Sequence, residues 1–139
     1  MTDGSTRATV DAFYKAYAAG DADTFSALIH DDINWIIYGP VQVFPFTGPR
    51  HGKQAVLDAL TGIAKDFALE RYVPQIVIVQ GDRAAVLSNA AFKQRSTNRT
   101  VSLRLADFIR LSEGKIIELS ELFDSFDAVE QALGRWLEV

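Results

Sequence analysis

The second half of the sequence contains four long strand-like segments, separated only by short polar or glycine-bearing connections. They are rich in β-branched and aromatic residues, and they span 72–79, 84–94, 101–111 and 115–123. Such short connections join antiparallel neighbours. The pattern therefore predicts a four-stranded antiparallel meander, against which the first half of the chain must pack.

The first half of the sequence is mainly helical. Apolar residues recur at helical spacing over 5–19, and Gly20 follows where a left-handed C-terminal cap is expected. A second, shorter helix follows the Gly20-Asp21 turn, and a third follows Gly52. Between these two helices, 33–38 is rich in β-branched and aromatic residues and predicts an additional strand.

Two segments lie outside this regular pattern. The stretch 39–52 holds three prolines and three glycines among apolar side chains, so we expect it to fold over the domain as a rim or lid. A last helix is predicted to begin at Asp124 or Ser125. Its apolar side would consist of Phe126, Val129, Leu133, Trp136 and Leu137.

Helices gathered in the first half and strands in the second indicate an α+β fold. Five such strands with helices on one face twist strongly, so we expect a curved antiparallel sheet that wraps around the N-terminal helices as a cone. The open end of such a cone is a natural apolar pocket. The length of 139 residues and the absence of repeats or linkers predict one domain that spans 1–139.

Composition limits the possible partners and cofactors. The formal net charge of -4 argues against nucleic acid, which is usually bound by a basic surface. There is no cysteine, and the two histidines lie outside any HExxH pattern, so we expect no metal site and no cofactor. The polar N-terminus is unlike a signal peptide and no stretch reaches membrane-spanning length, which predicts a cytoplasmic protein without membrane contact.

Two acidic residues fall on apolar faces of the predicted strands. Strand alternation places Asp107 on one face with Leu103 and Leu105. It places Glu121 on one face with Phe123. If both faces point inward, two carboxylates share the pocket.

Such a pair has a defined chemical use. An apolar wall raises the pKa of a carboxyl group, and a second carboxylate nearby raises it further. The pair can then supply both a proton donor and a base near neutral pH, which suits proton abstraction next to a carbonyl group or addition of water to a small ring. In the alternative, Asp107 and Glu121 pair with Arg104 or Arg110 at a sheet edge, or with backbone amides, and have no catalytic role.

The other pocket candidates are mainly aromatic. Nine Phe, four Tyr and two Trp are many for this length, and aromatic residues either fill a core or line a site. Trp35 and Tyr14 are the strongest candidates, because each joins a flat apolar surface to a hydrogen-bond donor. The predicted ligand-binding residues are Tyr14, Tyr17, Trp35, Phe46, Phe67, Phe92, Leu105 and Phe123.

Several short motifs follow one another in a specific order along nearly the whole chain. They are Gly20-Asp21, Asp31-Asp32, Gly39-Pro40, His51-Gly52-Lys53, Asp107-Phe108-Ile109-Arg110 and Gly114-Lys115-Ile116. This order resembles that of the nuclear transport factor 2-like superfamily, in particular the SnoaL-type polyketide cyclases and the ketosteroid isomerase relatives. The resemblance implies a cone-shaped fold with a deep apolar pocket for a small hydrophobic molecule.

The resemblance allows the site residues to be compared one by one. The general base of ketosteroid isomerase matches Ile37, which cannot take a proton. Its oxyanion-binding tyrosine matches Phe13, with Tyr14 adjacent but rotated about 100° around the helix axis. The second oxyanion residue, a carboxylic acid kept neutral by an apolar site, is retained as Asp107. Ketosteroid isomerase activity itself is therefore not expected.

Two hypotheses about function follow. The first is a SnoaL-like pocket protein that uses Asp107 and Glu121 for cofactor-independent acid/base chemistry, of isomerase, cyclase or hydratase type, on a hydrophobic carbonyl compound. The second is a non-catalytic ligand-binding or dimerisation module. The Asp-Arg-Asp set of limonene epoxide hydrolases fits poorly, because Arg104 and Asp107 would lie on opposite faces of their strand.

A homodimer is expected through the outer face of the sheet. The family resemblance implies this assembly. The outer face would also be too apolar to remain in water, because it would carry Leu87, Ala91, Ala106 and Phe108.

Overall fold

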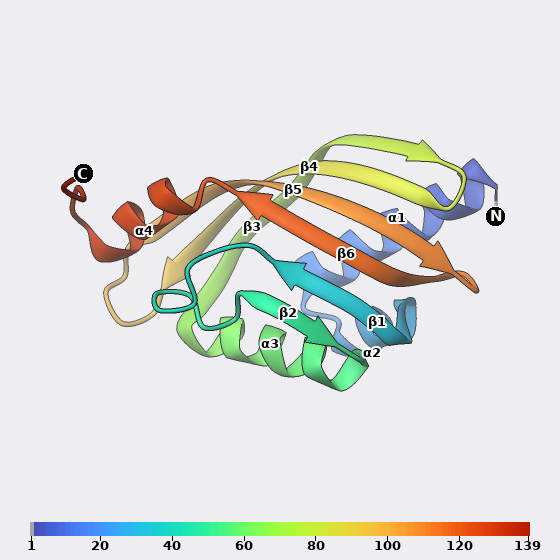
Figure 1. Cartoon of the computed structure of the whole chain (residues 1–139), viewed down its shortest axis with the longest axis horizontal. Helices are drawn as coiled ribbons and strands as arrows, with labels where there is room; N and C mark the ends of the chain where they lie inside the picture. The colour runs from blue at the N-terminus through green and yellow to red at the C-terminus, as the bar shows by residue number, and fades with distance from the viewer. Residues whose placement is uncertain (1) are drawn as a thin grey trace.

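Residues 2–139, which the computed structural model describes, form a curved six-stranded sheet with four helices packed around it (Figure 1). The helices are α1 (Asp3–Ala19), α2 (Ala22–Leu28), α3 (Lys53–Asp66) and α4 (Ser125–Leu133). The strands are β1 (Ile29–Ile37), β2 (Gly48–His51), β3 (Phe67–Gln80), β4 (Arg83–Gln94), β5 (Thr100–Ser112) and β6 (Lys115–Phe123). None of these helices is both long and apolar enough to cross a membrane.

The sheet has the strand order β2-β1-β6-β5-β4-β3. Strands β3 to β6 form the antiparallel meander, which confirms the predicted α+β fold with a curved sheet. Strand β1 pairs with β6 in parallel, so the sheet is mixed. The short strand β2 lies in the segment that was expected to be only a rim, and it pairs antiparallel with the other edge of β1.

Helix α1 packs against β3 and β4 on the inner face of the sheet, and local capping sets its ends. At its start, the side chain of Thr2 accepts a hydrogen bond of 3.0 Å from the backbone N–H of Ser5. Gly20 ends the helix with a left-handed φ of 68°. Phe13 and Tyr14 are only 3% and 4% exposed, so two adjacent aromatic residues lie at the centre of the cone.

The segment between β1 and β2 folds over one end of the sheet. Phe44 in this loop is buried, and it packs in a second apolar cluster with Val101, Ala128, Val129 and Ala132. Gly39 permits a close approach within the loop, because a Cβ atom there would lie 2.8 Å from Cγ2 of Thr47. The loop and α4 together close this end of the cone (Figure 1).

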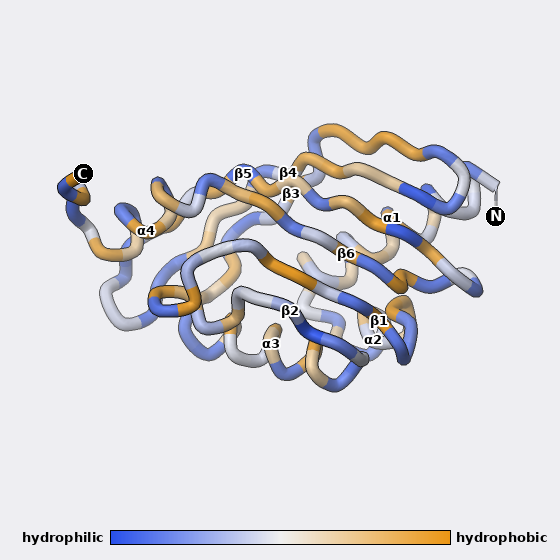
Figure 2. Tube along the Cα trace, in the orientation of Figure 1, coloured by the Kyte–Doolittle hydropathy of each residue, from blue (hydrophilic) through white to orange (hydrophobic). Residues whose placement is uncertain are grey.

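Helix α4 buries Val129 as predicted, but the rest of its buried side differs from the prediction. It ends at Leu133 because Gly134 has a left-handed φ of 69°, so Trp136 lies beyond the helix. The buried side consists of the small residues Ala128, Val129 and Ala132. Phe126, Leu133 and Trp136 are exposed, and for them the prediction was wrong. Small side chains let the helix approach the loop closely, and the apolar residues of the C-terminal end remain outside (Figure 2).

Candidate functional site

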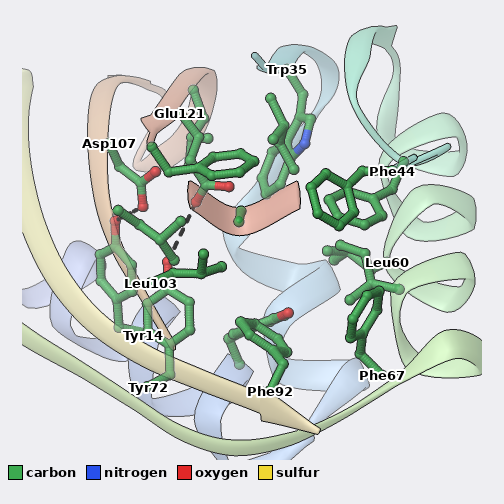
Figure 3. A pocket seen from close by; sticks show the side chains of 18 of the residues that line it. Tyr14, Trp35, Phe44, Leu60, Phe67, Tyr72, Phe92, Leu103, Asp107 and Glu121 are labelled. Carbon is green, nitrogen blue, oxygen red and sulfur yellow. Dashed lines mark hydrogen bonds between the residues drawn. The ribbon is translucent and has the colours of Figure 1, made fainter. Parts of the chain in front are cut away.

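An apolar cavity lies between α1 and the inner face of the sheet (Figure 3). Its volume is about 70 Å³, roughly half that of a cavity known to hold benzene. A ligand of that size or larger therefore requires some lining side chains to move. Most of the lining is aromatic: Phe13, Tyr14, Tyr17, Phe25, Trp35, Phe44, Phe46, Phe67, Tyr72, Phe92 and Phe123.

The structure brings all ten residues of the predicted site to this cavity. They are the acids Asp107 and Glu121 together with Tyr14, Tyr17, Trp35, Phe46, Phe67, Phe92, Leu105 and Phe123. These side chains come from α1, the loop before β2 and five of the six described strands, all except β2. Their roles in binding and catalysis stay predictions.

Asp107 and Glu121 face each other from neighbouring strands. They are directly opposite in the antiparallel register of β5 and β6, and both line the cavity (Figure 3). Asp107 is 2% exposed, whereas Glu121 is half-buried. Directly opposed side chains on one face of a sheet lie within a few ångströms at Cβ, so the two carboxyl groups influence one another.

Two tyrosines contact this acid pair (Figure 3). The hydroxyl of Tyr14 donates a hydrogen bond to Oδ2 of Asp107 at 2.6 Å, and the hydroxyl of Tyr72 donates to Oε1 of Glu121 at 3.4 Å. The residue comparison assigned the tyrosine position to Phe13, but the adjacent Tyr14 is the residue that reaches Asp107. Both helix positions line the cavity, because the sheet curves around a wide arc of α1.

Burial and mutual charge shift the pKa values of these groups. Burial raises the pKa of Asp107, and the polar side chains beside it, Glu121, Tyr14 and Tyr72, act against this rise. Burial, followed by the charge of Asp107, raises the pKa of Glu121 well above its ordinary value of 4.5. Burial and the charge of Asp107 also raise the pKa of Tyr14, so its hydroxyl stays protonated and donates. The two carboxyl groups therefore hold protons at a higher pH than ordinary surface acids do.

No positively charged side chain balances the acid pair. Among residues 2–139, no Lys, Arg or His lines the cavity, and no group of three or more potential metal ligands occurs. Arg104 is exposed, and Arg110 pairs with Glu118 at 2.8 Å on the other face of β5. The alternative in which Asp107 and Glu121 pair with these arginines is therefore wrong, and the Asp-Arg-Asp set does not form.

Three buried side-chain atoms have no hydrogen-bond partner in the part of the chain that the structure describes: Nε1 of Trp35, Oγ of Ser88 and Oδ1 of Asp107. Buried polar groups usually have a partner, because leaving one unpaired costs free energy. In Asp107, Oδ2 is bound to Tyr14. Its Oδ1 is therefore the carboxyl oxygen that remains for a bound molecule.

Aromatic side chains close the other end of the cavity. The ring centroid of Phe44 lies 5.6 Å from that of Phe46, 6.2 Å from that of Phe123 and 6.4 Å from that of Phe67. Phe44 and Phe46 belong to the loop between β1 and β2. Entry of a ligand at this end therefore depends on movement of loop side chains.

Tyr72 is the most important site residue that sequence reasoning missed. Strand β3 begins at Phe67 and contains register shifts at 69/71 and 74/76. Counting alternate residues from Phe67 turns Arg71 inward, whereas the bulge exposes Arg71 and turns Tyr72 toward the cavity. Phe44 was also missed, although an apolar residue in a proline-rich loop was a usable signal.

Solved structures of several proteins have the same fold. A candidate isomerase from Rhodopseudomonas palustris is 37% identical, with 97% of this chain and 100% of that chain covered and a TM-score of 0.84. A nuclear transport factor 2-like protein from Burkholderia xenovorans is 25% identical over 95% and 98% of the two chains, with a TM-score of 0.82. A protein with a ketosteroid isomerase-like fold from Catenulispora acidiphila, solved with trimethylamine, is 10% identical over 94% and 97%, with a TM-score of 0.77.

Sequence comparison agrees with these structures. No curated protein matches the chain. The family model of the SnoaL-like domain matches residues 10–119, which is most of the sequence. The chain therefore belongs to the SnoaL-like family of the nuclear transport factor 2-like superfamily.

Proposed function

We propose that this protein performs cofactor-independent acid/base chemistry on a hydrophobic carbonyl compound held in the cavity. The observation that carries the proposal is the direct pairing of Asp107 with Glu121 in an aromatic cavity. Two carboxyl groups in such surroundings share a proton near neutral pH. One of them can then donate a proton while the other accepts one.

The tyrosine contacts indicate which carboxyl group holds the proton. The hydrogen bond from Tyr14 to Asp107 is short, at 2.6 Å, and favours the ionised form of Asp107. The contact from Tyr72 to Glu121 is longer, at 3.4 Å, and favours the ionised form less. The shared proton therefore belongs mainly to Glu121. Asp107 is left as the base, with its Oδ1 free.

These roles match proton transfer next to a carbonyl group. Asp107 would take a proton from the carbon beside the carbonyl, while Glu121 would donate to the carbonyl oxygen and stabilise the developing enolate. Return of the proton to another atom completes an isomerisation, and attack of the enolate carbon on a second carbonyl completes a cyclisation. The 37% identity to a candidate isomerase supports the first of these.

The position of Glu121 compensates for the catalytic base that is missing when the chain is compared with ketosteroid isomerase. The base of ketosteroid isomerase relatives matches Ile37, which is inert. In the parallel pairing of β1 with β6, Ile37 lies directly beside Glu121. An acid is therefore present one strand away from the position that lacks one, which supports acid/base chemistry with a rearranged set of residues.

Exchange of protons beside a carbonyl group tests this proposal without the natural substrate. A panel of small hydrophobic ketones, including α-tetralone, is incubated with the protein in deuterium oxide, and loss of the α-proton signals is followed by NMR. We expect faster exchange than without protein, and a loss of about a hundredfold or more in Asp107→Asn.

The matched control for this experiment is Glu118→Gln, which changes an acid of β6 that pairs with Arg110 outside the cavity. It should retain the full exchange rate. Equal rates for Asp107→Asn and the unmodified protein on every ketone that exchanges would contradict the proposed role.

A non-catalytic ligand-binding or dimerisation module is the second candidate function. The small volume of the cavity and the packing of Phe44 and Phe46 at its end favour the dimerisation form, because a largely filled aromatic core can serve stability alone. One result of the exchange experiment distinguishes the two candidate functions. Ketones that bind tightly but exchange no α-protons would indicate binding alone.

We also propose that the protein acts in the cytoplasm as a homodimer through the outer face of the sheet. Ile76, Ile78, Phe108 and Leu122 are 45% to 62% exposed there. Ala91, expected on this face, is only 2% exposed and adds nothing to it, while Leu87 and Ala106 are half-buried. An apolar face of this kind favours association. Sedimentation should give a dimer that Phe108→Glu dissociates, and a monomer for the unmodified protein at micromolar concentration would contradict the proposal.

A further inference from the structure

The indole of Trp35 is a second polar group in the cavity, separate from the acid pair. Trp35 lies in the middle of β1, lines the cavity and is 6% exposed. Its Nε1 has no hydrogen-bond partner within residues 2–139. A buried N–H of a tryptophan usually has one. The protein therefore keeps a buried donor that its own fold does not use.

Packing gives no reason for this donor. The indole ring lies 6.4 Å from the ring of Phe13 between centroids, and its neighbours along β1 on the same face, Ile33 and Ile37, are buried and apolar. A phenylalanine would provide an aromatic surface in the same place without an unpaired N–H. The donor is therefore explained better by a bound molecule than by the core.

The indole nitrogen and the acid pair are two separate polar points. Trp35 pairs with Leu119 across β1 and β6, and Glu121 lies two residues further along β6. In Figure 3 the indole nitrogen lies on the side of the ring toward Phe44, whereas the acids lie on the opposite side. A molecule that reaches the acids with one end can therefore present a second atom to Trp35.

The atom that accepts a hydrogen bond from Trp35 should be uncharged. Within the described residues no cationic side chain lines the cavity. A carboxylate or phosphate group would therefore be buried without a partner charge and close to two acids, which is unfavourable. Carbonyl, hydroxyl and ether oxygens accept from an indole N–H without this penalty.

We propose that the ligand is an uncharged hydrophobic compound with two oxygen functions. One oxygen lies at Asp107 and Glu121, and the other accepts a hydrogen bond from Nε1 of Trp35. The inference rests on the proposed function, which puts the first oxygen, a carbonyl, at the acid pair. Trp35 then determines specificity: it selects, among hydrophobic carbonyl compounds, those with a second oxygen.

The test uses the fact that the chain has only two tryptophans. Trp136 is 83% exposed, so Trp136→Phe leaves Trp35 as the single indole without disturbing the cavity. The probes are α-tetralones with a methoxy group and their counterparts with an ethyl group at the same ring position. Each pair differs by one ether oxygen in place of a CH₂ group.

For at least one ring position, we expect the methoxy compound to bind about three- to tenfold more tightly than the ethyl compound, the value of one neutral hydrogen bond. It should also move the indole N–H signal of Trp35 downfield in NMR spectra, which the ethyl compound should not do. Trp35→Phe, measured by calorimetry, should remove the preference, so that the methoxy and ethyl compounds bind with equal affinity whatever the smaller ring does to both. Measurable binding of the ethyl compound checks that the variant folds and keeps its cavity.

Two results would overturn the inference. Ketones could bind without any methoxy preference, or the preference could survive in Trp35→Phe. In both cases α-proton exchange would still report on Asp107, so the proposed function could stand while the inference falls. If no tetralone binds or exchanges protons, the proposed function fails for this ligand class, and the inference fails with it.

Discussion

The two ends of the cavity are built from different kinds of structure. At one end, Asp107, Glu121 and Tyr14 belong to central strands and a long helix, and hydrogen bonds hold them in place. At the other end, Phe44 and Phe46 belong to a loop, and their side chains are held by apolar packing. Reactive groups are thus fixed on regular elements, while side chains of a loop control volume and access. The two properties should therefore respond to different mutations.

The largest effect should come from the loop end, in Phe44→Ala. Phe44 is 3% exposed and packs against Phe46, Phe67 and Phe123, so its removal should lower the free energy of unfolding by about 3–5 kcal/mol. The enlarged cavity should admit bulkier ketones, while the pH profile of proton exchange stays the same. Urea denaturation and the exchange assay measure the two outcomes.

Trp136→Ala is the control for an aromatic residue outside the cavity. Its side chain is 83% exposed, so the expected change in the free energy of unfolding is below about 0.5 kcal/mol. A shifted pH profile in Phe44→Ala would show that the two ends of the cavity are coupled. They would then not respond independently to mutation.

An intermediate effect is expected at the acid end, in Tyr14→Phe. Without the donated hydrogen bond, the ionised form of Asp107 is less stable, so its pKa rises and less base is present at neutral pH. Exchange at pH 7 should fall about tenfold, and the acid limb of the profile should move to higher pH. Tyr38→Phe, which changes an exposed tyrosine after β1, should leave both unchanged. An unshifted acid limb in Tyr14→Phe would show that Tyr14 does not affect the pKa of Asp107.

The smallest effect is the pH dependence of stability. The pKa of Glu121 is raised in the folded protein, so the folded state binds more protons than the unfolded state once the pH exceeds about 4.5. The free energy of unfolding should therefore fall as the pH rises from 4.5 through the raised pKa. Glu121→Gln should flatten this fall and be more stable than the unmodified protein at pH 8, but not at pH 4. If the free energy of unfolding changed with pH in the same way in both proteins, burial of Glu121 would be contradicted.

The sequence predicted those parts of the molecule that depend on local pattern. Alternation along β5 placed Asp107 and Arg104 on opposite faces, and in the structure Asp107 is buried whereas Arg104 is exposed. Helical spacing and Gly20 placed α1 and its end. These features follow from backbone geometry within one element, which the residues of that element determine.

Other parts depended on contacts that a local pattern does not contain. The parallel pairing of β1 with β6, which brings Ile37 beside Glu121, joins segments more than eighty residues apart. The bulges of β3, which turn Tyr72 inward, arise from its pairing with β4. The curvature of the sheet around α1 lets both Phe13 and Tyr14 reach the cavity. Helical geometry alone therefore could not decide which of the two residues contacts Asp107.

Titration of the side-chain carboxyl of Glu121 by carbon-13 NMR shows whether Asp107 and Glu121 share a proton in the apolar cavity. The unmodified protein should give a pKa of Glu121 well above 4.5. Asp107→Asn should lower this pKa, because the charge of Asp107 is removed, but leave it above 4.5, because the burial remains. A Glu121 that titrates near 4.5 in both proteins would show that the two carboxyl groups share no proton.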